Sequence, residues 1–223
     1  MTSSDAVLAI LAKAPLPGLV KTRMCPPLRP EQAAELYAAM LLDILAQHDV
    51  EPDVDVTLWY APDDALDWFR AHVPPRFALR AQQGPDLARR MTALVRAHAE
   101  QGYTRMVLRG TDSPTLPPSR IGEAFEALHR CDVVLCPDTD GGYNLIGVRK
   151  PSDALFELEM STASVLDATL RKARELGLRV ELLEPHHDVD TAADLPLLAR
   201  ELSPDRTPRT RDWLERHAAE VKG

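Results

Sequence analysis

The sequence is poor in cysteine, in aromatic residues and in positive charge. Its three cysteines are an odd number and form no Cys-x-x-Cys pair, which argues against a disulfide framework or a cysteine zinc site. Aromatic side chains make up 5% of the residues, too few for a surface on which nucleic-acid bases stack. The formal net charge of −8 lacks the cationic field that nucleic acids and anionic membranes attract. We therefore expect no nucleic-acid partner and no membrane partner.

Long apolar runs and a basic leader are also missing. No run approaches the ~18 apolar residues of a membrane-spanning helix. The residues before the apolar stretch 6–12 contain no Lys or Arg, unlike a signal peptide. Hydrophobic residues still make up 45% of the 223, enough for a packed core. We expect a cytoplasmic protein with a single domain over 1–223, its core at about 6–202 and a C-terminal tail at 203–223.

Short apolar runs alternate with amphipathic stretches along the chain. Ala6–Ala12 is continuously apolar, which is typical of a strand buried on both faces of a parallel sheet. Pro30 opens a stretch with apolar residues at helical spacing. Further strands are expected at 54–60, 77–79, 106–108, 133–136, 143–148 and 178–183, and further helices at 62–69, 87–95, 118–130, 161–176 and 191–202. This order predicts an α/β fold with a mostly parallel sheet covered on both faces.

The loop after the first predicted strand is basic. In such sheets ligands bind beyond the carboxyl ends of the strands, and this loop carries Lys13, Lys21 and Arg23. Lys offers phosphate a compact charge and Arg a planar fork. Gly18 would let backbone N–H groups approach an anion closely. The composition predicts phosphate binding, although it fits an ordinary solvated loop equally well.

Carboxylates follow two other predicted strands. Asp112 lies in Thr-Asp-Ser-Pro, and Asp188 and Asp190 follow the last strand. Mg²⁺ typically takes one or two protein carboxylates plus phosphate oxygens, so these acids would suit a metal–nucleotide site opposite the basic loop. Each Asp alone is more typical of a turn or a helix cap, and it is their placement together with the basic loop that favours the functional interpretation. The adjacent His186 and His187, in a proline-containing loop, are more typical of solvated residues than of metal ligands.

Paired glycines, Gly141 and Gly142, follow Asp140 between two predicted strands. Such a pair allows a positive φ or a close approach of the backbone to a ligand. A plain hairpin turn is the stronger interpretation of this segment.

Together these motifs resemble one family. They are Lys13-Ala14-Pro15, Pro17-Gly18, Lys21-Thr22-Arg23-Met24, Thr111-Asp112-Ser113-Pro114, Asp140-Gly141-Gly142-Tyr143, Leu145-Ile146-Gly147, Ser161-Thr162 and Asp188-Val189-Asp190-Thr191. In this order, over roughly residues 6–200, they are similar to the small bacterial transferases labelled radical-SAM/selenodomain-associated or glycosyltransferase-like. That family is related to the 2-phospholactate guanylyltransferases and, more distantly, to the molybdenum-cofactor nucleotidyltransferases. The resemblance implies a three-layer GT-A (nucleotide-diphospho-sugar transferase) fold.

The resemblance also implies roles for individual residues. The phosphate-binding loop would comprise Lys13, Pro17, Gly18, Lys21, Thr22 and Arg23. Asp112 and Asp190 would hold Mg²⁺ or Mn²⁺, and Lys21, Arg23 and Asp112 would be catalytic. The acceptor or nucleotide pocket would comprise Asp140, Gly141, Gly142, Tyr143, Asn144, Ser161 and Thr162. The chain departs from the family pattern at Ala88, Arg89 and Met160.

Three functions fit these residues. In nucleotidyl transfer, the ionised phosphate of a small acceptor attacks the α-phosphorus of a nucleoside triphosphate and needs no protein base. In glycosyl transfer from a nucleotide sugar, an inverting enzyme would need a base such as Asp138, Asp140 or His187. The third is a nucleotide-binding protein without catalysis. The single Asp before Ser-Pro, in place of Asp-x-Asp, favours nucleotidyl transfer.

Overall fold

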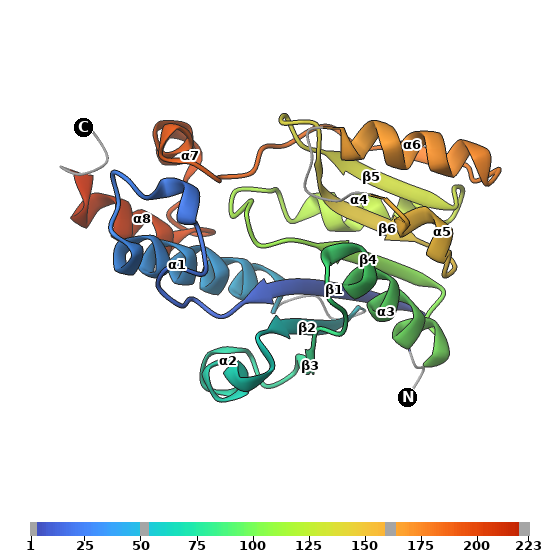
Figure 1. The fold of residues 1–223 in the computed structure, drawn as a ribbon, viewed down its shortest axis with the longest axis horizontal. Coiled ribbons are helices and arrows are strands. Elements are labelled where there is room, and N and C mark those ends of the chain that lie inside the picture. The colour runs from blue at the N-terminus through green and yellow to red at the C-terminus, as the bar shows by residue number, and fades with distance from the viewer. Residues whose placement is uncertain (1–3, 50–53, 159–163, 219–223) are drawn as a thin grey trace.

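The computed structural model of the protein describes residues 4–49, 54–158 and 164–218. Its centre is a seven-stranded sheet in the order β3-β2-β1-β4-β6-β5-β7 (Figure 1). The strands are β1 (Ala6–Lys13), β2 (Asp55–Ala61), β3 (Ala78–Ala81), β4 (Arg105–Arg109), β5 (Val133–Pro137), β6 (Tyr143–Val148) and β7 (Val180–Leu182). Every neighbouring pair is parallel except those of β6, which runs antiparallel to β4 and β5. The predicted α/β class and mostly parallel sheet are confirmed.

Helices cover both faces of this sheet. One face carries α1 (Pro30–His48), α2 (Leu66–His72) and α4 (Ser119–Ala127), and the other carries α3 (Leu87–Glu100), α5 (Asp153–Phe156) and α6 (Val165–Glu175). Strand β1 shows why a layer of helices is needed on each face of the sheet. Leu8 and Ile10 face the first layer, Val7 and Ala9 face the second, and all four are 0% exposed. A strand that is apolar on both sides is stable only between two layers of helices.

The segment predicted as a C-terminal tail differs in the structure. It contains helix α8 (Pro208–Arg216), which lies beside α1 (Figure 1). Trp213 on this helix is 1% exposed, and Thr210 donates from its backbone N–H and its hydroxyl to the buried carboxylate of Asp43, at 2.8 and 2.7 Å. Two sequence features are typical of this helix, namely the proline at the first helical position and the apolar Trp-Leu pair.

A third apolar cluster holds the site loops against α1. It joins α8 and α7 (Leu195–Glu201) to the outer face of α1. Met24, at the end of the short 3-10 helix η1 (Thr22–Met24), and Val189, after β7, are both 0% exposed within it. The residues on either side of these two apolar side chains include Lys21, Arg23 and Asp190. Packing therefore fixes the two loops on which most of the predicted site residues lie.

Three predicted helices differ at their starts. The expected helix at 191–202 begins with the 3-10 turn η3 (Ala192–Asp194) before α7, and a similar turn, η2 (Asp63–Ala65), precedes α2. The expected helix at 161–176 corresponds to α6, which begins at Val165. The predicted residues Ser161 and Thr162, with Met160, lie outside the described part of the chain.

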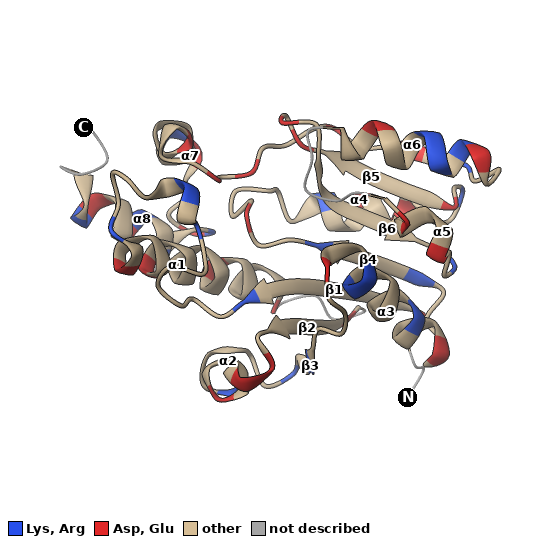
Figure 2. Ribbon diagram, viewed as in Figure 1, with Lys and Arg blue, Asp and Glu red and all other residues tan. Residues whose placement is uncertain are grey.

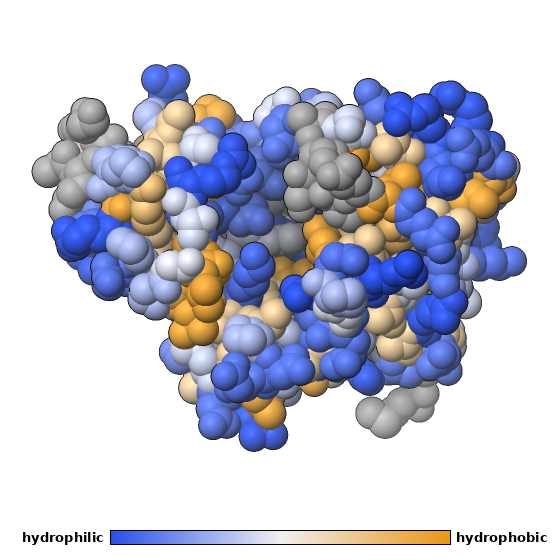
Figure 3. Space-filling view, in the orientation of Figure 1, coloured by the Kyte–Doolittle hydropathy of each residue, from blue (hydrophilic) through white to orange (hydrophobic). Residues whose placement is uncertain are grey.

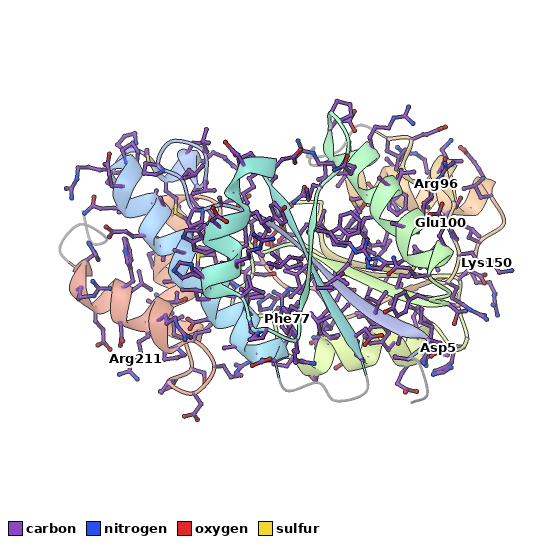
Figure 4. The ribbon with its side chains drawn as sticks, turned by 90° about the horizontal axis from the view of Figure 1, so that it is seen from below. Asp5, Phe77, Arg96, Glu100, Lys150 and Arg211 are labelled. Atoms are coloured by element: carbon purple, nitrogen blue, oxygen red, sulfur yellow. The ribbon has the colours of Figure 1, made fainter. Side chains whose placement is uncertain are left out.

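The sheet has two distinct edges along the strand direction. Val148 pairs with Met106 at the start of β4, so the following Lys150 marks the amino-terminal edge. Lys150 and Arg211 of α8 lie at opposite ends of the molecule (Figure 4). Among the described residues, none of the helices has the length and apolar character that a membrane crossing requires.

Candidate active site

The loops after β1, β4 and β7 meet at the carboxyl edge of the sheet. The Lys21 ammonium contacts the carboxylate of Asp112 and lies 3.1 Å from Oδ1 of Asp190. Arg23 Nη1 lies 3.3 Å from Oδ2 of Asp190. Basic segments of the first loop and acidic segments of the other two lie on the same side of the sheet in Figure 2. The structure thus brings together the residues that were predicted to bind phosphate and metal.

Lys21 is held in an unusual conformation. Its φ of 48° lies in the left-handed region, which costs a non-glycine residue roughly 1–3 kcal/mol and which the surrounding contacts must compensate. Its side chain is only 4% exposed. Burial alone would lower the pKa of Lys21, but the carboxylates of Asp112 and Asp190 outweigh it and raise the pKa above its ordinary value. Lys21 therefore keeps its positive charge throughout the neutral range.

Hydrogen bonds fix the three loops to one another. The Tyr37 hydroxyl, 3% exposed, accepts from the backbone N–H of Lys13 at 3.0 Å and lies 2.8 Å from Oγ1 of Thr111. Burial, with the nearby charge of Asp112, raises the pKa of Tyr37 to about 12, so the hydroxyl stays protonated. The backbone N–H of Val189 donates to the carbonyl of Asp112 at 2.8 Å. The acids and the basic loop are thus held in place before any ligand binds.

The carboxylate of Asp190 lines the cleft. Thr191, and not Asp190, makes the helix-cap contacts. The backbone N–H and hydroxyl of Thr191 donate to Oδ2 of Asp194 at 2.7 and 2.9 Å. The backbone N–H of Asp190 donates to the same oxygen at 2.9 Å. Its carboxylate takes no part in the cap and contacts Lys21 and Arg23 instead.

A cleft with two halves opens above these residues. The smaller half has a volume of about 500 Å³ and the larger about 740 Å³. Asp112, Asp190 and Arg23 line both, so they lie at the junction. The space-filling view shows the molecule hollowed near its centre, with hydrophilic residues around the hollow (Figure 3).

The two halves differ in charge. The smaller one is lined by four cations, Lys13, Lys21, Arg23 and Arg90, against the three acids Asp86, Asp112 and Asp190. The larger one is lined by Asp138, Asp140 and Asp188 in addition to the junction residues, with an apolar wall from Leu87, Met91, Leu108, Ile146 and Val165. The smaller half therefore suits an anion, and the larger half suits a molecule that offers hydrogen-bond donors.

Two carboxyl groups in the larger half are perturbed. Burial, reinforced by the negative charge of Asp112, raises the pKa of Asp188 to about 8. Burial and a hydrogen bond with Asp140 raise the pKa of Asp138 to about 6. Asp138 Oδ1 also accepts from the backbone N–H groups of Thr139 and Asp188, at 2.6 and 3.1 Å. Perturbed acids of this kind cluster at functional sites.

Arg109 supports the Asp112 loop from beneath. It is 1% exposed, and its guanidinium donates to the carbonyls of Gly110 and Ser113 at 3.1 and 2.9 Å and to Nε2 of His48 at 2.7 Å. Burial lowers the pKa of Arg109 to about 10 and, with Arg109 itself, lowers the pKa of His48 well below its usual range. The charged guanidinium of Arg109 therefore contacts the neutral imidazole of His48 on one side and the backbone of the Asp112 loop on the other.

The acids at the junction fit a hard divalent cation. Oδ1 of Asp188 is buried without a hydrogen bond to any described residue. Asp112 and Asp190 lie beside it with side chains 43% and 36% exposed. Carboxylate oxygens are the ligands that Mg²⁺ takes, and a divalent cation here would favour the ionised form of Asp188, whose pKa is raised to about 8 without it.

The remaining predicted residues divide between the halves. Lys13 and Thr22 line the smaller half, whereas Pro17 and Gly18 are exposed and line neither; the φ of Gly18 is 77°. The larger half is lined by Asp140, Gly142, Tyr143 and Asn144. Gly141 lies beside it, with a φ of 92° and a carbonyl that accepts from Leu166 at 3.0 Å. The segment is also the predicted hairpin turn between β5 and β6, and its contact with a ligand stays a prediction.

Sequence reasoning missed four residues of this site. Tyr37 and Arg109 fix the loops, and Gln82 and Arg90 line the smaller half. Gln82 donates from Nε2 to the carbonyls of Ala12 and Trp59, at 3.0 and 2.9 Å. Of these four, only Arg109 could have been recognised from the sequence, because it is a charged residue directly after the apolar strand predicted at 106–108.

Comparison with known proteins agrees with this geometry. A solved structure from Desulfovibrio desulfuricans G20, assigned as a nucleotide-diphospho-sugar transferase, matches with a TM-score of 0.92 and 32% identity over 99% of this chain and 98% of that chain. CMP:2-keto-3-deoxy-manno-octonic acid synthetase complexed with CTP shares the fold, with a TM-score of 0.58 and 12% identity over 90% of this chain and all of that one. The 2-phospho-L-lactate guanylyltransferase of Methanothermobacter thermautotrophicus is 29% identical over 182 residues, which are 78% of this chain and 76% of that protein.

The fold and these relatives define a transferase of the GT-A-like, nucleotide-diphospho-sugar transferase type, related to the phospholactate guanylyltransferases. More narrowly, the chain belongs to the DUF2064 family, described as uncharacterized proteins conserved in bacteria, which matches residues 44–162. The matched range contains Asp112 and the Asp140 turn, whereas Lys21 and Asp190 lie on either side of it.

Proposed function

We propose that the protein is a nucleotidyltransferase, which transfers a nucleoside monophosphate from a nucleoside triphosphate to a small phosphorylated acceptor. The observation that carries the proposal is the distribution of charge in the cleft. Cations outnumber acids in the smaller half, acids outnumber cations in the larger half, and the Lys21–Asp112–Asp190 contact lies between them. A nucleotide whose triphosphate reaches this contact would present its α-phosphorus at the junction of the two halves.

The donor nucleotide fits the smaller half. Lys13, Lys21, Arg23 and Arg90 supply positive charge for the phosphates, and Leu11, Ala12 and Leu19 supply apolar contact for the nucleoside. The relative from Methanothermobacter is named a guanylyltransferase, which makes GTP the first donor to test. The structural neighbour that was solved with CTP makes CTP the second.

A divalent cation such as Mg²⁺ or Mn²⁺ would be held by Asp112 and Asp190 next to Asp188, and it would supply positive charge that offsets the charge of the phosphates. Side chains of the protein would bind and orient the phosphates. Lys21, buried and fixed by its backbone, would hold the triphosphate in register with the junction. Arg23 has a side chain 68% exposed and lines both halves, so its guanidinium can reach oxygens of donor and acceptor alike.

The reaction needs no proton transfer by the protein. An oxygen of the acceptor phosphate, ionised at neutral pH, attacks the α-phosphorus and forms a new P–O bond. The bond from the α-phosphorus to the bridging oxygen breaks, and pyrophosphate leaves with that electron pair. Lys21 and Arg23 stabilise the charge that develops on the transferred group.

The larger half indicates the chemistry of the acceptor. Its phosphate would lie at the junction beside Arg23, and the remainder would face the carboxyl groups of Asp138 and Asp140. Carboxylates accept hydrogen bonds and repel anions, so this half favours hydroxyl or amino groups over a second acidic group. We therefore expect a phosphorylated polyol or amino alcohol to be preferred to a phosphorylated carboxylic acid.

Glycosyl transfer from a nucleotide sugar is the second candidate, and one observation favours it. The pKa of Asp138, raised to about 6 by burial, suits a general base that deprotonates an acceptor hydroxyl near neutral pH. The Desulfovibrio structure is assigned to nucleotide-diphospho-sugar transferases as well. The two candidates differ in their products, because glycosyl transfer releases a nucleotide and no pyrophosphate.

A product assay separates the two functions. The protein would be incubated with Mg²⁺, GTP or CTP, and a panel of phosphorylated polyols, amino alcohols and carboxylic acids, and pyrophosphate would be measured. We expect acceptor-dependent release that falls by about 100-fold or more in Lys21→Ala, in line with the loss of one charge that acts on the transition state. Lys150→Ala removes a lysine at the opposite edge of the sheet and should leave the rate unchanged. Turnover of nucleotide sugars without pyrophosphate would replace the proposal by glycosyl transfer.

A further inference from the structure

A second cluster of metal-ligating side chains lies behind the cleft. His186 and His187 follow β7, and Glu201 ends α7. His187 Nε2 lies 3.5 Å from Oε2 of Glu201, and one ligand atom from each of the three residues lies within 4.8 Å of the others. None of the three lines either half of the cleft. The cluster is therefore separate from the carboxylates at the junction.

The side chains are arranged as ligands rather than as surface groups. The His187 side chain is 12% exposed, and its Nε2 is buried without a hydrogen bond to any described residue. The rings of His186 and His187 lie with their centroids 4.8 Å apart, so both point to the same region although the residues are adjacent. The expectation that this pair is solvated is wrong, because the strand pairing of the segment turns it towards α7.

A buried hydroxyl orients the donors. Thr115, 4% exposed, lies in the loop after β4. Its Oγ1 donates to Oε2 of Glu201 at 3.1 Å and lies 3.0 Å from Nε2 of His186. Metal-binding carboxylates and imidazoles are typically held by such neighbouring hydrogen bonds, which fix their direction.

The backbone of the cluster is fixed as well. The N–H of His186 donates to the carbonyl of Pro137 at 3.0 Å, and its carbonyl accepts from Nδ2 of Asn144 at 3.2 Å. Glu201 follows Leu195 and Leu198, which are 0% exposed in the cluster beside α1. Donors from two independently anchored elements thus converge before any ion binds.

We propose that His186, His187 and Glu201 form a site for one divalent transition-metal ion of the Zn²⁺ class, with the fourth position open to water. Two imidazole nitrogens and one carboxylate are a ligand set that suits Zn²⁺ and Co²⁺, whereas Mg²⁺ prefers oxygen ligands alone. The site joins the segment before Asp188 and Asp190 to α7, so a bound ion stabilises one wall of the cleft from outside. Because none of the three residues lines the cleft, binding of this ion does not depend on the reaction that the cleft performs.

The test measures binding of the metal alone to the full chain. Zn²⁺ affinity would be measured by competition with a chromophoric chelator, and Co²⁺ would be added to read the visible absorption of a tetrahedral site. We expect one ion per chain and an increase in Tm with Zn²⁺. His187→Ala and Glu201→Gln should each weaken binding by at least tenfold, and Glu201→Gln keeps the size of the side chain if the alanine variant folds poorly.

Two control variants exclude other Zn²⁺ donors. His72 is an exposed histidine on α2, and Cys25 is a partly exposed thiol. His72→Ala and Cys25→Ser should both bind Zn²⁺ as the wild type does. The proposal is overturned if the wild type binds no Zn²⁺, if His187→Ala and Glu201→Gln bind it unchanged, or if Cys25→Ser abolishes binding.

Discussion

Replacing Asp188 by Asn should stabilise the protein when no divalent cation is present. The folded chain buries this carboxyl beside Asp112 and Asp138, and burial raises its pKa from 3.8 to about 8. At pH 7 this carboxyl is mainly protonated in the folded chain and ionised in the unfolded chain. Each unit of pKa shift corresponds to about 1.4 kcal/mol, so keeping Asp188 protonated at pH 7 costs the folded state up to roughly 4 kcal/mol. Asparagine has the same shape and no charge. Water in the open cleft reduces the effect, and we expect a gain of about 2–4 kcal/mol in the free energy of unfolding.

The pH dependence follows from the direction of the shift. Because the folded-state pKa of Asp188 is raised, its contribution to stability is complete below pH 3.8 and is lost as the pH rises to about 8. The difference between Asp188→Asn and the wild type should therefore grow between pH 4 and pH 8. Urea unfolding followed by circular dichroism, with a chelator present, measures this difference at each pH.

A matched control and a metal titration complete the experiment. Asp64 is exposed on η2, and Asp64→Asn should change stability by less than about 0.5 kcal/mol at every pH. Mg²⁺ should stabilise the wild type and have little effect on Asp188→Asn, because the cation relieves the repulsion that the substitution removes. Parallel pH profiles for the wild type and Asp188→Asn would refute the assignment of an uncompensated buried acid.

Four further substitutions test the packing of the fold. Trp213→Ala removes a buried side chain that holds α8 on α1 and should cost about 3–5 kcal/mol in urea unfolding. Burial lowers the pKa of His98 to about 4, so the wild type should lose up to roughly 3 kcal/mol as the pH falls from 6.5 to 4, and His98→Gln should flatten this decline. Gly147→Ala places Cβ 2.6 Å from Cγ1 of Val134 and should cost about 1–3 kcal/mol, whereas Gly122→Ala on α4 meets no atom within 4 Å and should be neutral or stabilising.

Much of the fold follows from local sequence. The continuous apolar run of β1 predicted a strand covered on both faces, and the regular alternation of runs predicted the parallel sheet. The same reasoning placed Lys21 and Asp190 together although 169 residues separate them, because both follow strands that end at one edge of the sheet. The contact itself is now observed, and the roles in binding and catalysis stay predictions.

The rest depends on contacts that no local pattern encodes. The burial of Asp188 results from the packing of Val189 against α1 and α7. Arg109 reaches His48 across 61 residues of sequence, and neither residue type favours that pairing by itself. Helix α8 was predicted as a tail because its charged residues outnumber the three side chains that it buries. Such features are decided by tertiary packing and not by periodicity.

Calorimetric titration of GTP and of guanosine, with and without Mg²⁺, tests most directly whether polyphosphate is bound between the basic loop and the acids. We expect GTP binding that depends on Mg²⁺ and weakens by about 10–100-fold in Lys21→Ala and in Asp112→Asn, as expected for the loss of one charge-assisted contact, with no change in guanosine binding or in Lys150→Ala. Equal losses of GTP and guanosine, or GTP binding that is unaffected by Asp112→Asn, would contradict the account.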